Sequence, residues 1–263
     1  MKSEIISLLR SIKIQKRVIG ALILREIITR YGRQNIGFLW LFAEPLLLIF
    51  LIVVFIRVRG GTHADSSLIA FVLTGYSIAM MWRNGSNRSS KAIGANIGML
   101  FHRNVRVLDL FLSRLVLEVA GATVAFSTLM FGFYMINWVK IPNDILYMTY
   151  AWILMAWFSF GLGLIVGALS ERFETVERFW AIFSFVIFPL SGVFFKVDSL
   201  SPKTQEIVLA FPMIHGTEMI RHGYFGAQMK THESISYLVI CNVIMTFIGL
   251  ILVKKYSQGV EPS

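Results

Sequence analysis

The sequence lacks the residues on which most soluble enzymes and secreted domains depend. It has one cysteine, Cys241, so it cannot form an intrachain disulfide, and this cysteine lies in an apolar run typical of a small buried side chain. Only 15% of the residues are charged, against about 25% in an average soluble domain. Because there is no G-x-x-x-x-G-K-[ST] phosphate loop and no dinucleotide fingerprint, we expect no nucleotide site and no cofactor in this chain.

Recognisable metal and catalytic patterns are also missing. His215, Glu218 and His222 share one helical face, but their spacing is wider than the i, i+4 histidine pair of zinc-binding helices. We therefore favour an interfacial cluster and expect no metal. Glu44, Glu118 and Glu218 belong to separate segments without an evident acid–base partner. A membrane enzyme that modifies lipid-linked glycans is thus the weaker alternative.

Long apolar runs dominate instead. Hydrophobic residues make up 56% of the chain and the mean hydropathy is +0.68. Several runs reach the roughly 20 residues that a helix needs to cross a bilayer. We therefore predict one all-α transmembrane domain over residues 1–263, whose first span also acts as the targeting signal because no cleavable signal peptide precedes it. The six predicted spans are residues 36–56, 67–82, 107–138, 145–169, 179–195 and 235–253.

The segment before the first span is basic. Between residues 18 and 34, Ile23 and Ile27 share one helical face while Glu26 and Arg30 share another. This pattern predicts that the N-terminal segment, residues 1–34, holds a helix in the membrane interface, although a helix packed on protein would show the same pattern.

Three features inside the predicted membrane region indicate how it is built. Glu44 precedes Pro45 near the middle of the first span, which predicts a kink and a carboxylate that faces the bundle interior. The third span is longer than a bilayer requires, so its first turns, with Arg114 and Glu118, should project from the cytoplasmic side or line a groove. The glycines at 161, 163 and 167 predict a close helix–helix approach.

Residues 196–233 form the longest segment between predicted spans. They are too broken for a span and too apolar for a solvated loop, so we expect broken or re-entrant helices on the periplasmic side. With this topology, 18 of the 25 Lys and Arg lie in cytoplasmic segments, which predicts that both termini are cytoplasmic. The same bias and anionic lipids account for the net charge of +10, and we expect no nucleic-acid partner.

Two segments carry a resemblance to a known family. They are REIITRYGRQNIGFLWLFAEP at 25–45 and PLSGVFFKVDSLSPKTQEIVLAFPMIHGTEMIRHGYFG at 189–226. With the basic N-terminal helix and the six spans, the chain resembles the membrane subunit of type-2 ABC exporters. Within that group it is similar to the capsular-polysaccharide exporters of Gram-negative bacteria. Export of O-antigen, teichoic acid or a small drug by the same architecture stays open as the alternative.

The resemblance implies a homodimeric permease in the bacterial inner membrane. Two copies of a cytoplasmic ABC ATPase subunit would bind it and carry the ATP and magnesium. The substrate would be a lipid-linked polysaccharide that moves through a channel between the two protomers. A periplasmic co-polymerase and an outer-membrane channel would continue the route.

The resemblance also assigns candidate residues. The coupling helix for the ATPase falls at about residues 89–101, and the candidate contact residues are Arg88, Lys91, Ile93, Ile97, His102 and Arg103. The N-terminal helix becomes a gate helix, with Arg25, Arg30 and Arg33 as cationic candidates at the substrate entrance. Lipid headgroups are the alternative ligands for these arginines.

The channel and its exit have a separate set of candidates, among them aromatic residues on which sugar rings could stack. Core packing and interfacial belts are the alternative explanation for the aromatic residues, and Trp82 in particular is expected as an interfacial anchor at the end of its span. The channel and exit candidates are Trp40, Glu44, Trp82, Trp152, Lys196, His215, Glu218 and Arg221.

Overall fold

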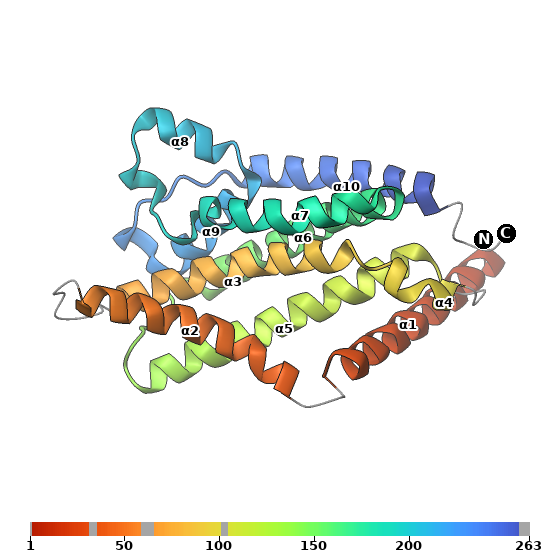
Figure 1. Cartoon of the computed structure of the whole chain (residues 1–263), viewed down its shortest axis with the longest axis horizontal. Helices are drawn as coiled ribbons and strands as arrows, with labels where there is room; N and C mark the ends of the chain where they lie inside the picture. The colour runs from red at the N-terminus through yellow and green to blue at the C-terminus, as the bar shows by residue number, and fades with distance from the viewer. Residues whose placement is uncertain (1, 32–35, 59–65, 101–104, 258–263) are drawn as a thin grey trace.

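The fold is a bundle of long helices that run back and forth along the long axis of the molecule, with α1 and α5 inclined to the others (Figure 1). The computed structural model describes residues 2–31, 36–58, 66–100 and 105–257, and this part of the chain is helical without any strand. The long helices are α1 (Lys2–Tyr31), α2 (Ile36–Val58), α3 (Ser66–Ser89), α5 (Val107–Met135), α6 (Ile145–Arg172), α7 (Glu174–Phe188) and α10 (Ile235–Ser257).

Short helices lie at the two ends of this bundle. At one end, with the first turn of α1 and the last turn of α10, lie η1 (Gly94–Asn96) and α4 (Ile97–Leu100) (Figure 1). At the opposite end, α8 (Pro202–Leu209) and α9 (Pro212–Phe225) lie between the short turns η3 (Val197–Ser199) and η4 (Gly226–Gln228). We call these the α4 end and the α8 end. The segment 196–233 thus consists of short helices separated by breaks, in keeping with its interrupted apolar pattern.

Four helical segments in the described part of the chain are long and apolar enough to cross a membrane. They are Val107–Met135, Ile145–Arg172, Glu174–Val193 and Ile235–Tyr256. The prediction of an all-α membrane protein is therefore confirmed. Within the described residues, the first predicted span contributes only a shorter apolar helical stretch, Phe42–Leu51.

Helix α6 occupies the centre of the bundle and packs against α3, α5, α7, α9 and α10. Its glycines make these approaches close. A Cβ atom on Gly161 would lie 3.2 Å from the Cβ of Met245 in α10, and one on Gly167 would clash with the ring of Phe111 in α5. The close approach expected from the small residues is confirmed, because a Cβ atom at Gly167 would lie too close to both the Phe111 ring in α5 and the backbone oxygen of Ser89 in α3.

Helix α3 differs from the expectation for the second span. It continues from Ser66 to Ser89, past the predicted end at residue 82. Trp82 therefore lies within the helix and is only 1% exposed, packed in the main hydrophobic core. The expectation of an interfacial anchor at Trp82 is wrong, because the polar residues that follow it extend the helix instead of ending it.

Helix α7 follows α6 after a single non-helical residue, Phe173, so the charged stretch between the fourth and fifth predicted spans belongs mostly to the two helices. At its other end, α7 passes into a π-helical turn, η2 (Pro189–Val193). Gly192 in this turn has a φ of 83°, which only glycine adopts without strain. The turn ends the helix and redirects the chain toward α8.

Candidate functional site

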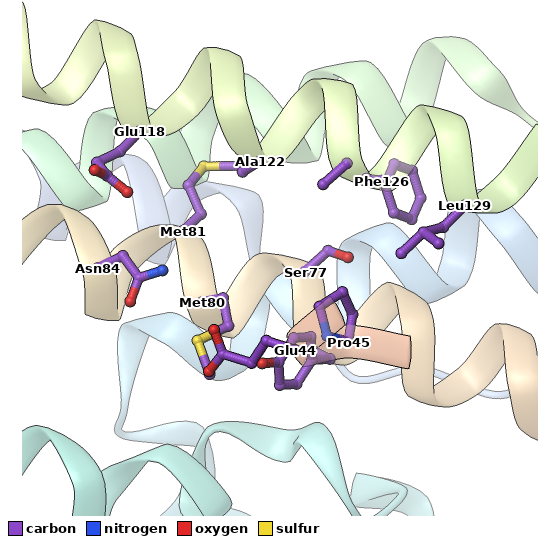
Figure 2. A pocket seen from close by; sticks show the side chains of 12 residues that line it. Glu44, Pro45, Ser77, Met80, Met81, Asn84, Glu118, Ala122, Phe126 and Leu129 are labelled. Carbon is purple, nitrogen blue, oxygen red and sulfur yellow. The ribbon is translucent and has the colours of Figure 1, made fainter. Parts of the chain in front are cut away.

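A hollow between α2, α3 and α5 contains the intramembrane carboxylate singled out from the sequence. Figure 2 shows the side chains that line it, and the space between them that is free of protein atoms, including the part open to the outside, amounts to about 510 Å³. We call it the carboxylate hollow. Its lining residues are Glu44, Pro45, Tyr76, Ser77, Met80, Met81, Asn84, Glu118, Ala122, Ala125, Phe126 and Leu129.

Glu44 and Glu118 reach this hollow from different helices, α2 and α5 (Figure 2). The carboxylate of Glu44 interacts with Tyr76 of α3, and Glu118 is paired with Arg88, whose Nε lies 2.5 Å from its Oε1. Glu44 thus faces the interior of the bundle, where such a carboxylate is expected. Helix α2 continues through Pro45, so the proline does not end it.

A second hollow opens near the α4 end, with about 1130 Å³ not filled by protein atoms. We call it the basic hollow. Its walls come from α1, the last turns of α3, the segment that follows α3, the first turns of α5 and the first turns of α7. The lining residues are Glu26, Asn84, Asn87, Arg88, Ser90, Lys91, Ala95, Arg114, Glu177, Arg178 and Ala181. Of the two places predicted for Arg114 and Glu118, the structure favours a groove wall.

Polar contacts join the walls of the basic hollow. Arg114 donates to the backbone oxygen of Arg88, and its Nε lies 3.6 Å from Oε1 of Glu26 in α1. Lys91 lies 3.4 Å from Glu177 in α7. One turn beyond Glu177 in α7, the indole Nε1 of Trp180 donates to the hydroxyl of Ser86 in α3 over 3.1 Å. The end of α3 is therefore tied to both α5 and α7.

Three of the six predicted ATPase-coupling residues, Arg88, Lys91 and Ile93, have described side chains, and all three lie at this end. Ile93 is buried together with Leu22 of α1 and Leu100 of α4 in one hydrophobic cluster. Arg88 and Lys91 line the basic hollow. The side chain of Ile97 and all of His102 and Arg103 lie outside the described residues. The expected helix over residues 89–101 is split into the short elements η1 and α4.

The predicted entrance arginines lie on or after α1. Arg25 hydrogen bonds to Asn96 of η1. The side chain of Arg30 and all of Arg33 lie outside the described residues. Helix α1 packs on α5 through Leu22 while Leu24 and Ile28 are exposed. One face of this helix therefore packs on protein, which is the alternative that the sequence left open.

Candidates for the channel occupy different environments within one chain. Trp40 is exposed on α2, whereas Trp82 is buried in the core. Trp152 of α6 donates to the hydroxyl of Thr123 over 2.9 Å and stacks on Phe126 of α5. Their predicted roles along a sugar pathway stay predictions.

At the α8 end, α9 supplies polar partners for the irregular backbone after α7. Arg221 is completely buried and donates to the oxygens of Val193 and Phe195 over 2.9 and 3.1 Å. Thr217 donates to the oxygen of Ser191 over 2.9 Å. Buried carbonyl groups outside regular helices need such donors, so α9 stabilises the turn that ends α7.

The other predicted exit residues lie on α9 itself, as His215 and Glu218 do, or just after the turn that ends α7, as Lys196 does. Glu218 is buried, with one oxygen 3.9 Å from Arg221 and the other accepting from the backbone of His232. His215 donates from Nε2 to the oxygen of Leu209, and its Nδ1 accepts from the backbone of Ser234, so it is the neutral tautomer. Lys196 is exposed and lines a hollow with four phenylalanines.

Hydrogen bonds and ion pairs between histidines and acidic residues hold residues 230–233, just before α10, in place. His232 donates to Asp198 over 2.8 Å and Lys230 lies 3.1 Å from it, and these hydrogen bonds lower the pKa of Asp198. Burial opposes ionisation of Glu233, but its hydrogen bonds, including one from His222, prevail and lower its pKa. Burial lowers the pKa of His215. Among the described residues no group of three potential ligands could hold a metal ion.

The family described as ABC-2 type transporter matches residues 17–225. The chain belongs to this family. It is 53% identical over 254 residues to the capsule polysaccharide export inner-membrane protein BexB of Haemophilus influenzae, covering 96% of each protein. It is 51% identical over 253 residues, again 96% of each, to the capsule polysaccharide export inner-membrane protein CtrC of Neisseria meningitidis serogroup B.

A more distant relative is the polysialic acid transport protein KpsM of Escherichia coli, 28% identical over 252 residues, or 95% of this chain and 98% of that protein. The resemblance drawn from the two sequence segments is therefore confirmed.

Some residues of this ABC-2 transporter were missed from sequence. Arg178 and Glu177, on the basic hollow, sit in a charged stretch that indicated only a connection between spans. Tyr76, the partner of Glu44, sits in an apolar run. A tyrosine inside a predicted span is a weak signal, because its hydroxyl needs a partner there but the sequence does not say which.

Proposed function

We propose that this chain is the permease subunit of an ATP-driven exporter that moves lipid-linked capsular polysaccharide across the bacterial inner membrane. The observation that carries the proposal is identity of 51–53% over nearly the whole length of proteins named for capsule polysaccharide export. These matches cover 96% of this chain and 96% of each relative, so the similarity extends over the whole helix bundle.

Six membrane crossings fit this function. Four helical segments qualify as spans by length and hydropathy, and α2 and α3 run alongside them in the bundle (Figure 1). Helix α3 is more polar, but it is buried against α5, α6, α7 and α9. Because these helices shield it from lipid, α3 does not need apolar residues on every face. With six crossings both termini lie on the same side of the membrane, and the Lys and Arg distribution supports the cytoplasm for this side and for the α4 end.

The energy for transport comes from a separate subunit in this proposal. The chain has no phosphate loop, and so ATP and magnesium belong to two copies of a cytoplasmic ATPase. The ATPase contacts η1 and α4, between α3 and α5. Two copies of the permease enclose the polysaccharide path, and a periplasmic co-polymerase and an outer-membrane channel receive the polymer.

A deletion in the native host tests the function. Loss of this gene should remove surface capsule and leave the polymer inside the cell, and a plasmid copy should restore export. Surface capsule measured by antibody or dye, together with intracellular polymer, separates export from synthesis. A deletion strain that keeps its capsule but loses O-antigen or another surface glycan would overturn the proposal in favour of that substrate.

A second experiment tests the ATPase contact without disturbing the fold. Gly98 in α4 and Gly132 in α5 both face open space, because a Cβ atom on either would meet nothing within 4 Å. Gly98→Trp should therefore abolish stimulated ATP hydrolysis by the partner while the protein stays in the membrane. Gly132→Trp is the matched control, and with it the partner should hydrolyse ATP at the normal stimulated rate. Normal hydrolysis with Gly98→Trp would remove the coupling role from α4.

A further inference from the structure

The basic hollow carries more positive than negative charge. Four of its lining residues are cationic and two are acidic. The cations are Arg88, Lys91, Arg114 and Arg178, and the acids are Glu26 and Glu177. Asn84, Asn87 and Ser90 add neutral hydrogen-bonding groups to the same wall. This composition suits an anionic ligand, because excess cations raise its local concentration and amide and hydroxyl groups can donate to its oxygens.

The cations are not equally engaged with the protein. Within the described chain, Arg178 forms no ion pair or hydrogen bond. Lys91 pairs with Glu177, but the two side chains are 66% and 41% exposed, and such pairs hold their partners weakly. Arg114 is different, since its side chain is only 8% exposed and its Nε lies 3.6 Å from Oε1 of Glu26 without forming a hydrogen bond. A buried guanidinium nitrogen without a hydrogen bond is costly, which points to a ligand oxygen that completes the site.

The surroundings of the hollow indicate the rest of the ligand. Residues next to its charged wall on α7, Phe179 and Ile182, are exposed and apolar, and so are Ile27 and Ile28 beside Glu26 on α1. A free inorganic anion would gain nothing from such a rim. An anion attached to an acyl chain would bury the chain along α7 while its headgroup enters the hollow.

We propose that the basic hollow is a binding site for the phosphate-bearing headgroup of a lipid, and that this lipid is the anchor of the exported polymer. The assignment rests on the proposed export function for the identity of the lipid, but not for the binding itself. Arg178 and Lys91 contact the headgroup from α7 and from the segment after α3, and Arg114 closes the site from α5. Glu177 competes with the ligand for Lys91.

Binding is tested on the purified full-length protein in uncharged detergent with dioctanoyl phosphatidylglycerol as the probe. Arg178→Gln should weaken binding about tenfold, the effect of one lost hydrogen bond between charged groups. Glu177→Gln should strengthen binding severalfold, because it frees Lys91 and removes a negative charge. Lys203→Gln, an exposed charge change on α8, is the control and should bind as the wild type does.

Opposite signs for the two variants are the decisive result, because damage to the fold would weaken both. Unchanged binding with Arg178→Gln, or weaker binding with both variants, would overturn the site. Inorganic phosphate that competes as strongly as the short-chain lipid would overturn the lipid part of the assignment. Equal binding of dioctanoylglycerol, which lacks the phosphate, would overturn the headgroup part.

Export in cells separates this inference from the proposed function. Arg178→Gln should lower surface capsule and raise intracellular polymer, whereas Lys203→Gln should export normally. Normal export by Arg178→Gln, in a host whose capsule depends on this gene, would overturn the anchor assignment and leave the export function standing. A deletion strain that keeps its capsule would instead refute the function, whatever the purified protein binds.

Discussion

Replacing Arg221 by Met should destabilise the protein more than any surface substitution. The Met side chain fills a similar volume but leaves the oxygens of Val193 and Phe195 without a donor, in a place with no exposure to solvent. Each unsatisfied buried group costs about 1–3 kcal/mol, and losing the stacking of the guanidinium over Phe71, 3.5 Å away, adds about 2 kcal/mol. Relaxation of the turn after α7 offsets part of this cost, so we expect a loss of about 3 kcal/mol.

For a chain of this size, that loss lowers the melting temperature by about 6–12 °C. The measurement is thermal unfolding in detergent, followed by tryptophan fluorescence. Lys203→Met, on the exposed face of α8, should change the melting temperature by no more than about 1 °C.

A double variant isolates the contribution of Glu218. The carboxylate of Glu218 lies 3.9 Å from Arg221. If the positive charge of Arg221 stabilises this buried carboxylate, the double variant Arg221→Met, Glu218→Gln should lose about 1 kcal/mol less free energy of unfolding than the sum of the two single variants. Equal melting temperatures for Arg221→Met and Lys203→Met would refute the argument that Arg221 holds the turn.

Three further predictions concern the packing, the topology and the pH response. Gly75→Ala should lower the free energy of unfolding by about 1–3 kcal/mol in the same assay, because the new Cβ would lie 2.6 Å from Nη2 of Arg221. Gly20→Ala on α1 is the control and should not destabilise the protein, because its Cβ would meet no atom within 4 Å. Equal stability of the two variants would contradict the packing at Gly75. In a Cys241→Ala background, a cysteine at position 200 should react with an impermeant thiol reagent from the periplasm and one at position 91 should not, and the reverse result would invert the topology. Asp198→Asn should lower the melting temperature slightly at pH 7. Since the pKa of Asp198 is lowered, its stabilising effect is complete above about pH 4 and is lost as the pH falls through the lowered value, so the difference should vanish in strong acid; a constant difference would refute the pairing.

Several local features could be predicted because they depend on neighbours in the chain. The apolar runs predicted a helical membrane protein, and Gly161 and Gly167 predicted close helix packing. The segments at 25–45 and 189–226 carried the resemblance that predicted the family. Helix ends were harder, as α3 illustrates: the polar residues after Trp82 resembled a loop, but contacts with α5, α6 and α7 keep them helical.

By itself, the sequence determined the class of protein and the family, and it predicted that the energy source lies on a separate subunit. It also indicated which polar residues would be unusual, among them Glu44, Glu118 and Arg221. Only the tertiary structure decided their partners: Glu44 with Tyr76, Glu118 with Arg88, and Arg221 with the backbone after α7. The physical reason is that lipid and protein interior are both apolar, so the sequence of a spanning helix does not mark which side faces its neighbours. The rotation of each helix sets that side, and with it which charges line the two hollows and which, like Arg221, are buried against the backbone.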